Sequence, residues 1–257
     1  EMLGRAHVFV VPLDDDRRWY RYHHLFRDML RQRLLRTVEG PRVATLHLRA
    51  SRWFEEERFV VSAVDHAIAA ADLSRATALI DDHAGRLWAT GEQATLLRWL
   101  DALPAEGLRA RPQLCIVYAL VLFAAGRSDE SATFLDAAQQ ALDTPSDREQ
   151  ISLRGVLDAA RAFVAFSRGD LPEIVRFSRR ALDRLPQDDL LWRSIATYTL
   201  GLAQRLSGDL PAAERTLEDA VRLGTATDNH YVALVARLNL ARLQAQRGHL
   251  RRADEML

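Results

Sequence analysis

Lysine is absent from this chain, so all 35 of its basic residues are arginines. A P-loop nucleotide site needs a lysine after its glycine-rich turn, and the chain therefore cannot hold ATP in a P-loop. Neither sign of charge is in excess, because 35 acidic residues balance the arginines. Domains that bind nucleic acid usually carry a basic excess or patch, so we predict no direct nucleic-acid contact by this segment.

Cysteine and long apolar runs are scarce. The single cysteine, Cys115, excludes an internal disulfide and suits a reducing cytoplasm. It lies in the apolar segment 114–122, which is shorter than the roughly 20 residues that cross a bilayer. No signal-peptide pattern opens the chain, which begins like the middle of a sequence, so we expect a piece of a longer protein. We predict a cytoplasmic protein without membrane contact, in which Cys115 is a buried, unreactive thiol.

A recurring glycine-centred phrase is the main feature that the chain does have. Its glycines stand 43, 39 and 40 residues apart, and a small residue precedes each of them by seven positions. The glycines are Gly126, Gly169, Gly208 and Gly248, and the small residues are Ala119, Ala162, Gly201 and Ala241. A fixed period of this kind is typical of stacked helical hairpins, in which glycine ends the first helix of each pair. The pattern predicts an all-α fold, a TPR-like superhelix of helical hairpins (an α-α solenoid).

The expected helices of the array follow from this phrase and from the apolar periodicity. They cover residues 112–125, 129–143, 147–168, 172–185, 189–207, 211–223, 228–247 and 250 onward. Asp188 and Asp189 are expected to cap one of them. Because a solenoid normally ends in a polar cap and the pattern stops within a helix at Leu257, we expect further chain beyond it.

The first 40 residues have a different character. A β-type run over 7–13, an acidic turn at 14–16 and an aromatic run over 17–22 predict a small β-hairpin, followed by a helix from His23. Within the next segment, the sequence from Ala71 repeats the phrase with alanine in the glycine position. We therefore predict three segments: 1–40, the hairpin and helix; 41–110, irregular helical linker or degenerate repeats; and 111–257, the regular array.

The phrase Trp19-Tyr-Arg-Tyr-His-His-Leu-Phe26 closely resembles one family. In the large ATP-binding regulators of the LuxR type, the MalT-like proteins, this phrase closes the nucleotide-binding module at its winged-helix unit. The resemblance continues through Trp53-Phe54, His66-Ala67, Trp99-Leu100 and Leu103-Pro104 and covers essentially the whole chain. It implies that the hairpin is the end of a winged-helix unit and that the array is a sensor. ATP or ADP would bind elsewhere in the parent protein, no cofactor would bind in this segment, and the active parent would oligomerise on DNA.

The same resemblance singles out the histidine pair His23 and His24. In related switch ATPases a winged-helix histidine reaches the phosphate of bound ADP and holds the closed state, and the resemblance places that role on this pair. The alternative is structural, with one histidine packed under the hairpin and the other capping the helix.

The inner face of the array is the second candidate site, for a small-molecule inducer or a regulatory protein. Counting from each small residue places five aromatic and cationic side chains on this face: Phe163, Phe166, Tyr198, Arg205 and Arg242. Aromatic surface with a few hydrogen-bond donors suits a small polar ligand or a peptide. Ordinary repeat packing with solvated arginines is the competing interpretation.

No other combination of residues indicates chemistry. The eight histidines show no pairing typical of zinc, and no catalytic constellation stands out, so we predict neither a metal site nor enzymatic activity in this segment. Two alternatives to the transcriptional regulator stay open. One is the regulatory TPR-like tail of a serine/threonine protein kinase, and the other is a plain TPR-like scaffold without a small ligand.

Overall fold

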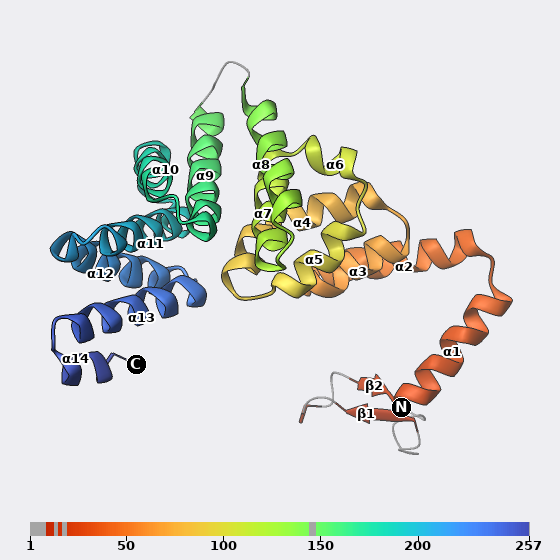
Figure 1. Ribbon diagram of the computed structural model, residues 1–257. Coiled ribbons are helices and arrows are strands. Elements are labelled where there is room, and N and C mark those ends of the chain that lie inside the picture. Colours follow the sequence, from red (N-terminus) through yellow and green to blue (C-terminus); the bar gives the residue numbers. More distant parts are fainter. Residues whose placement is uncertain (1–8, 13–14, 17–19, 144–147, 257) are drawn as a thin grey trace. The chain divides into compact units, whose positions relative to one another are not determined.

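The computed structural model describes residues 9–12, 15–16, 20–143 and 148–256. The chain divides into two compact units, residues 1–76 and 77–257, which we describe separately. Among the described residues there are fourteen α-helices, one 3₁₀ turn and one two-stranded sheet (Figure 1). The predicted all-α solenoid with a small N-terminal β-hairpin is confirmed. The three predicted segments 1–40, 41–110 and 111–257 stay a prediction.

The first unit opens with the hairpin. Strand β1 (Val10–Pro12) pairs antiparallel with β2 (Tyr20–Tyr22), with Val10 opposite Tyr22. The backbone N–H of His23 donates to the carbonyl of Phe9 at 2.8 Å, and the ring of Phe9 stacks on that of Phe26 at 4.5 Å between centroids. These contacts tie the hairpin to the following helix. Trp19 and part of the acidic turn lie outside the described residues.

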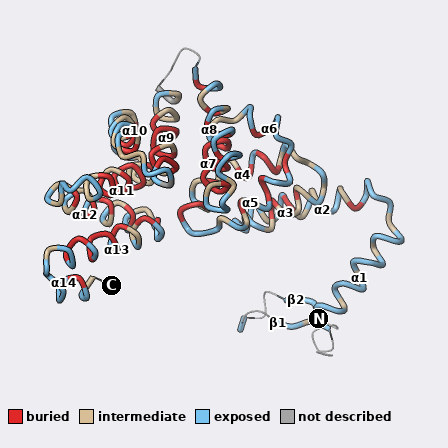
Figure 2. The backbone as a smooth tube through the Cα atoms, in the orientation of Figure 1, coloured by how far each residue is buried: buried red, intermediate tan, exposed pale blue. Residues whose placement is uncertain are grey.

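Three helices follow the hairpin: α1 (His24–Thr37), α2 (Gly40–Glu56) and α3 (Val60–Ala69). Helix α1 has no buried residue, and its tube in Figure 2 is almost entirely exposed or intermediate. In contrast, α2 and α3 pack against each other, and the Ser51 hydroxyl donates to the Ala63 carbonyl at 2.8 Å. Gly40 and Pro41 form the first turn of α2, where proline costs little.

The second unit contains the rest of the helices, and its boundary with the first falls within α4. The helices that open it are α4 (Leu73–Ala89), α5 (Gln93–Asp101) and α6 (Ala105–Arg109). The array comprises α7 (Pro112–Ala124), α8 (Ser128–Leu142), α9 (Arg148–Ala165), η1 (Phe166–Arg168), α10 (Leu171–Arg184), α11 (Leu190–Leu206), α12 (Leu210–Ala226), α13 (His230–Gln246) and α14 (Leu250–Asp254). Every predicted helix of the array is present, and the expected end of the third is a 3₁₀ turn.

The glycine positions behave as predicted. The four array glycines have φ between 67° and 85°, the left-handed region in which only glycine is unstrained. Ala71, at the degenerate position, adopts the same conformation with φ of 56° despite its Cβ. Gly91, with φ of 91°, is a further turn of this type that the repeat pattern did not reveal.

Helix starts in the array are fixed by short polar side chains. The carboxylates of Asp170, Asp189 and Asp209 each accept a hydrogen bond from the backbone N–H three residues later, at 3.1 to 3.2 Å. The amide oxygen of Asn229 does the same at 3.2 Å. These caps satisfy N–H groups that would otherwise lack a partner, and they confirm Asp189 as a helix cap.

Small residues hold the helices close together. A Cβ added to Gly201 on α11 would lie 2.9 Å from Leu217 Cγ on α12, closer than side-chain carbons approach. Helices α7, α9, α11 and α13 also contact one another in succession, as the first helices of consecutive pairs. They form the inner layer, and their buried faces are red in Figure 2. Side chains on this layer make up the predicted inner face.

The single cysteine is placed as predicted. Cys115 is fully buried on α7, and its thiol donates to the carbonyl of Leu108 at 3.2 Å. Burial raises the pKa of the thiol to about 11, so the reactive thiolate is suppressed at neutral pH.

Candidate functional site

An aromatic cluster gathers on the inner layer around Phe163 of α9. The ring of Phe163 lies 6.3 Å from that of Trp88, 5.7 Å from that of Phe123 and 6.1 Å from that of Tyr231, between centroids. All three pairs meet edge to face, with interplanar angles of 69° to 88°, an arrangement that aromatic quadrupoles favour. The partners come from α4, α7 and α13, so one side chain joins rings from helices that are not neighbours in the array.

A polar group adjoins this cluster. Tyr198 of α11 is 6% exposed, and its pKa is raised to about 12, first by burial and then by the nearby hydroxyl of Tyr231. The charges of Arg205 and Arg242 and a hydrogen bond with the Asn239 side chain act in the opposite direction. Electrostatic coupling thus links Tyr198 with both arginines and with Tyr231, which also belongs to the aromatic cluster. We call the aromatic cluster and this polar group together the inner-face site.

The two arginines of the inner-face site lack anionic partners. Burial, and then the charge of Arg242, lower the pKa of the Arg205 guanidinium. Within the described part of the chain, neither arginine takes part in an ion pair. The Nε of Arg205 and the Oδ1 of Asn239 are buried atoms without a hydrogen-bond partner. The site thus contains two arginines without an ion-pair partner among the described residues and two buried polar atoms without a hydrogen-bond partner.

The structure brings most of the predicted groove residues together. Electrostatic coupling links Tyr198 with Arg205 and Arg242, and Tyr231 couples to Tyr198 while its ring contacts that of Phe163. Phe166 lies in the 3₁₀ turn after α9 and is 44% exposed, and no described ring contact joins it to the cluster. Whether any of these side chains binds a ligand stays a prediction.

Sequence reasoning did not identify Trp88, Tyr231 or Asn239. Tyr231 stands about three helical turns before Arg242, the counted position on α13, so extending the count along the same face would have reached it. Trp88 belongs to α4, outside the regular array, and no period connects it with Phe163. Asn239 lies three residues before Arg242 and is 4% exposed, a burial that the sequence pattern does not show.

The predicted nucleotide-sensing pair lies where β2 passes into α1. His23 is the residue before the first turn of α1, and its side chain makes no capping hydrogen bond. The rings of His23 and His24 lie 4.3 Å apart, and both residues are exposed. Their placement leaves both imidazoles accessible, and their proposed role toward ADP stays a prediction.

A second histidine pair lines a cavity of about 720 Å³ in the first unit. The Nδ1 atoms of His47 and His66 are 2.7 Å apart, a distance that requires one proton between them. Burial lowers the pKa of both imidazoles, and the charge of Arg31 lowers them further. The remaining lining combines five apolar residues with polar ones: Leu30, Leu34, Leu35, Val43 and Ala69, then Tyr22, Arg27 and Asp65.

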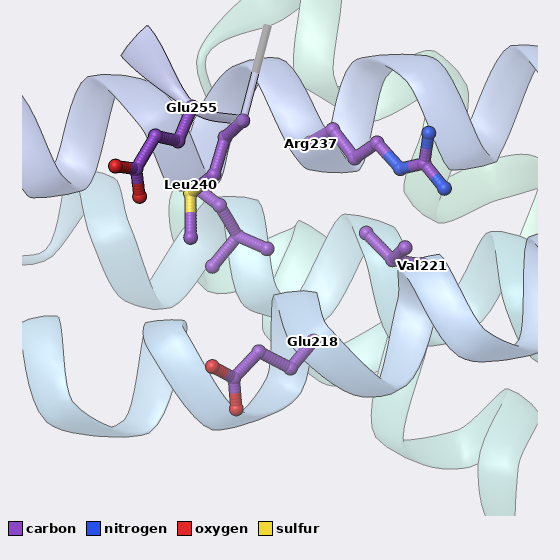
Figure 3. A pocket seen from close by; sticks show the side chains of 6 residues that line it. Glu218, Val221, Arg237, Leu240 and Glu255 are labelled. Carbon is purple, nitrogen blue, oxygen red and sulfur yellow. The ribbon is translucent and has the colours of Figure 1, made fainter. Parts of the chain in front are cut away.

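Two smaller cavities lie in the second unit, away from the inner-face site. One of about 310 Å³ lies between α12, α13 and the end of α14, and Figure 3 shows Arg237 extending away from the carboxylates of Glu218 and Glu255. The other, of about 430 Å³, contains the ion pairs of Arg127 with Asp101 at 2.9 Å and with Glu130 at 2.7 Å. The charges around Arg127 are therefore satisfied internally.

Two searches over the described residues gave negative results. No group of three or more His, Cys, Asp or Glu side chains among them could hold a metal ion. None of the helices in that part of the chain combines the length and apolar character needed to cross a membrane.

Comparison with known proteins gives matches along the whole chain. A family model described as the MalT winged helix domain matches residues 1–42, one described as the MalT-like TPR region matches residues 155–257, and a tetratricopeptide repeat model matches residues 112–137. Similar curated proteins include the HTH-type transcriptional regulators MalT of Serratia proteamaculans (strain 568) and Cronobacter sakazakii (strain ATCC BAA-894). Each is 29% identical over 255 residues, which cover 99% of this chain and 28% of the relative. The chain thus spans about a quarter of the length of these regulators.

Proposed function

Because this chain is similar to the MalT-type transcriptional regulators along nearly its whole length, we propose that it is the sensor segment of an ATP-dependent regulator of the LuxR type. An inducer or a partner protein binds the inner-face site and controls oligomerisation and DNA binding by the parent protein. The segment itself catalyses no reaction. The relatives are named as transcriptional regulators, which favours this function over a kinase tail or a plain scaffold.

The observation that carries the proposal is the inner-face site itself. Several of its side chains come from α9, α11 and α13, three consecutive first helices of the array. A ligand that contacts all three helices connects successive repeats. It favours the curvature of the array at which the spacing of these helices fits the ligand. It shifts the protein between two forms only by the difference in its affinity for them. A coupling of about 1–3 kcal/mol, typical of allosteric proteins, corresponds to a change in binding affinity of roughly 5- to 150-fold.

Nucleotide control belongs to the parent protein in this proposal. ATP or ADP binds in a separate module, and His23 or His24 contacts the phosphate of ADP from the winged-helix end. The exposure of both imidazoles supports the proposal, because a buried pair could not reach a second module. An ADP dissociation rate from the full-length protein that is unchanged by His24→Ala would contradict it.

The function is tested in the full-length regulator with a reporter for its target promoter. Tyr231→Leu and Tyr198→Phe alter the inner-face site while removing only a partly exposed ring or a single hydroxyl, so the fold should persist. We expect both variants to reduce induction, with protein abundance and thermal unfolding close to those of the unaltered protein. Leu234→Ala is the control, because Leu234 is 67% exposed on α13. Full induction in both inner-face variants would contradict the proposed function.

A further inference from the structure

Helix α1 lines a cavity in the first unit, which we call the α1 cavity. Its lining residues on this helix lie mostly three or four positions apart, on one face: Arg27, Leu30, Arg31, Leu34 and Leu35. Helices α2 and α3 supply the rest of the helical wall, which includes Val43, a residue that is 8% exposed. No residue of α1 is buried, so its apolar face is not covered by the neighbouring helices. The cavity of about 720 Å³ has the size of a small-molecule site.

The α1 cavity combines apolar surface with positive charge. Five of its lining residues are apolar. Arg31 is exposed and forms no ion pair with any residue that the structure describes. Arg27 contacts Asp28 at 3.1 Å, but this pair joins adjacent residues at the surface and contributes little. Asp65 also lines the cavity, and its negative charge disfavours a ligand that carries more than one.

The His47–His66 pair adds a group whose charge can change. The Nδ1 atoms of the two imidazoles are 2.7 Å apart, so one ring donates its proton to the lone pair of the other. The ring of Phe54 stacks on that of His66 at 5.3 Å between centroids, which holds this imidazole in place. One more proton can be taken up at an outer Nε2 atom without breaking the bond, and both outer nitrogens then carry N–H groups. An anion in the cavity favours this singly charged pair.

We propose that the α1 cavity binds a small monocarboxylic acid with an apolar body. The carboxylate contacts Arg31 and the His47–His66 pair, whose N–H groups and charge suit a single oxyanion. The apolar body packs against Leu34 of α1 and Val43 of α2. This site lies in the first unit, whereas the inner-face site belongs to the second, so the proposal does not rest on the sensor function.

Calorimetric titration of the 257-residue chain with octanoate tests the proposal. Octanamide has the same apolar body without the charge, and octylammonium carries the opposite charge. We expect saturable binding of octanoate at a single site and roughly tenfold weaker binding of octanamide, because the charge-assisted hydrogen bonds are missing. Octylammonium should not bind measurably.

The histidine pair makes this binding dependent on pH. The affinity for octanoate, which stays largely ionised, should rise several-fold from about pH 7.5 to about pH 5.5 as the pair takes up its proton. The other ionisable residues that line the cavity are Tyr22, Arg27, Arg31 and Asp65. None of them is a histidine, so the pair is the expected source of the change. His47→Gln should remove it.

Matched substitutions separate the α1 cavity from general attraction of anions. Arg31→Gln should weaken octanoate roughly tenfold and leave octanamide unchanged, since only the charged contact is lost. Arg33→Gln removes the same charge from an exposed position of α1 outside the cavity lining and should leave both affinities unchanged. Leu34→Ala should weaken both probes alike, because it shortens the apolar wall. Thermal unfolding of each variant checks that the fold persists.

Four results would overturn the proposal. The first is the absence of saturable octanoate binding, and the second is binding of octanamide or octylammonium as tight as that of octanoate. The third is equal weakening of octanoate by Arg33→Gln and Arg31→Gln. The fourth is an octanoate affinity that does not change with pH, since it would exclude the histidine pair from the site.

Discussion

Two groups of arginines in the second unit differ in what surrounds them. On the outer side of α9, Asp158 is 2% exposed and accepts from Arg184 at 2.6 Å, with Arg180 at 3.3 Å. On the inner layer, Arg205 and Arg242 form no ion pair with any residue that the structure describes. The first group joins α9 to α10 through a shared carboxylate, whereas the second has no such carboxylate among the described residues. The difference separates charges that hold two helices together from charges that do not.

Electrostatic cost supports this distinction. Burial raises the pKa of Asp158 even though three arginines act in the opposite direction, so its carboxylate depends on their presence. For Arg205, burial and a like charge act together to lower the pKa, and only the phenol of Tyr198 opposes them. Removing one arginine should therefore have opposite effects on stability at the two places.

The largest change in the free energy of unfolding is expected for Arg184→Met. This substitution leaves a buried carboxylate with a weaker cationic environment, and we expect a loss of about 2–3 kcal/mol in the free energy of unfolding, measured with urea. When the pKa of a carboxyl group is higher in the folded state than in the unfolded state, stability is lost as pH rises through the folded-state pKa. The substitution raises the pKa of Asp158 further, so the deficit should be larger at neutral than at acidic pH. A deficit independent of pH would contradict the role given to Asp158.

Arg205→Met should have a smaller effect of the opposite sign. The methionine removes a partly buried, unpaired cation and keeps an apolar side chain, so we expect a gain of about 0.5–1 kcal/mol in the same measurement. In the double variant with Arg242→Met, the gain should fall short of the sum, since either change relieves the same repulsion. A loss of stability in Arg205→Met would show that the inner arginines are structural and would remove the contrast.

The smallest effect on stability is expected at the His47–His66 pair. Its two imidazoles repel each other when both are protonated, and each can lose its proton. NMR titration should place both imidazole pKa values below 6.5, because burial, Arg31 and, for His66, its partner lower them. A lowered histidine pKa means that the unfolded chain binds more protons, so stability is complete above about pH 6.5 and falls as pH drops below it. His47→Gln should raise the pKa of His66. An unchanged value would show that the two rings are not coupled.

Much of the fold could be predicted from the sequence because its signals are local. The glycines, the acidic caps and the prolines act on the backbone within a turn of their own position, so the helix ends follow from them. The left-handed backbone at Ala71 was visible only through its place in the repeat, since alanine by itself predicts a helical conformation.

The inner-face site could be predicted only in part. Counting along each first helix identifies which side chains face inward, as for Tyr198 and Arg242. It does not report how far the superhelix turns between repeats, and that rotation decides which rings meet. The contacts of Phe163 with Trp88 and Tyr231 depend on it, so no count within one helix could have found them.

Those ring contacts also affect how the array unfolds. When each repeat contacts only its neighbours, the free energy of folding is close to a sum of local terms, and the ends can open independently. The ring of Phe163 adds contacts to α4 and α13, which lie beyond its immediate neighbours. Opening at either end therefore removes a contact from the middle of the array. We expect this part of the chain to unfold as one cooperative block, in which repeats that do not touch a ligand still respond to it.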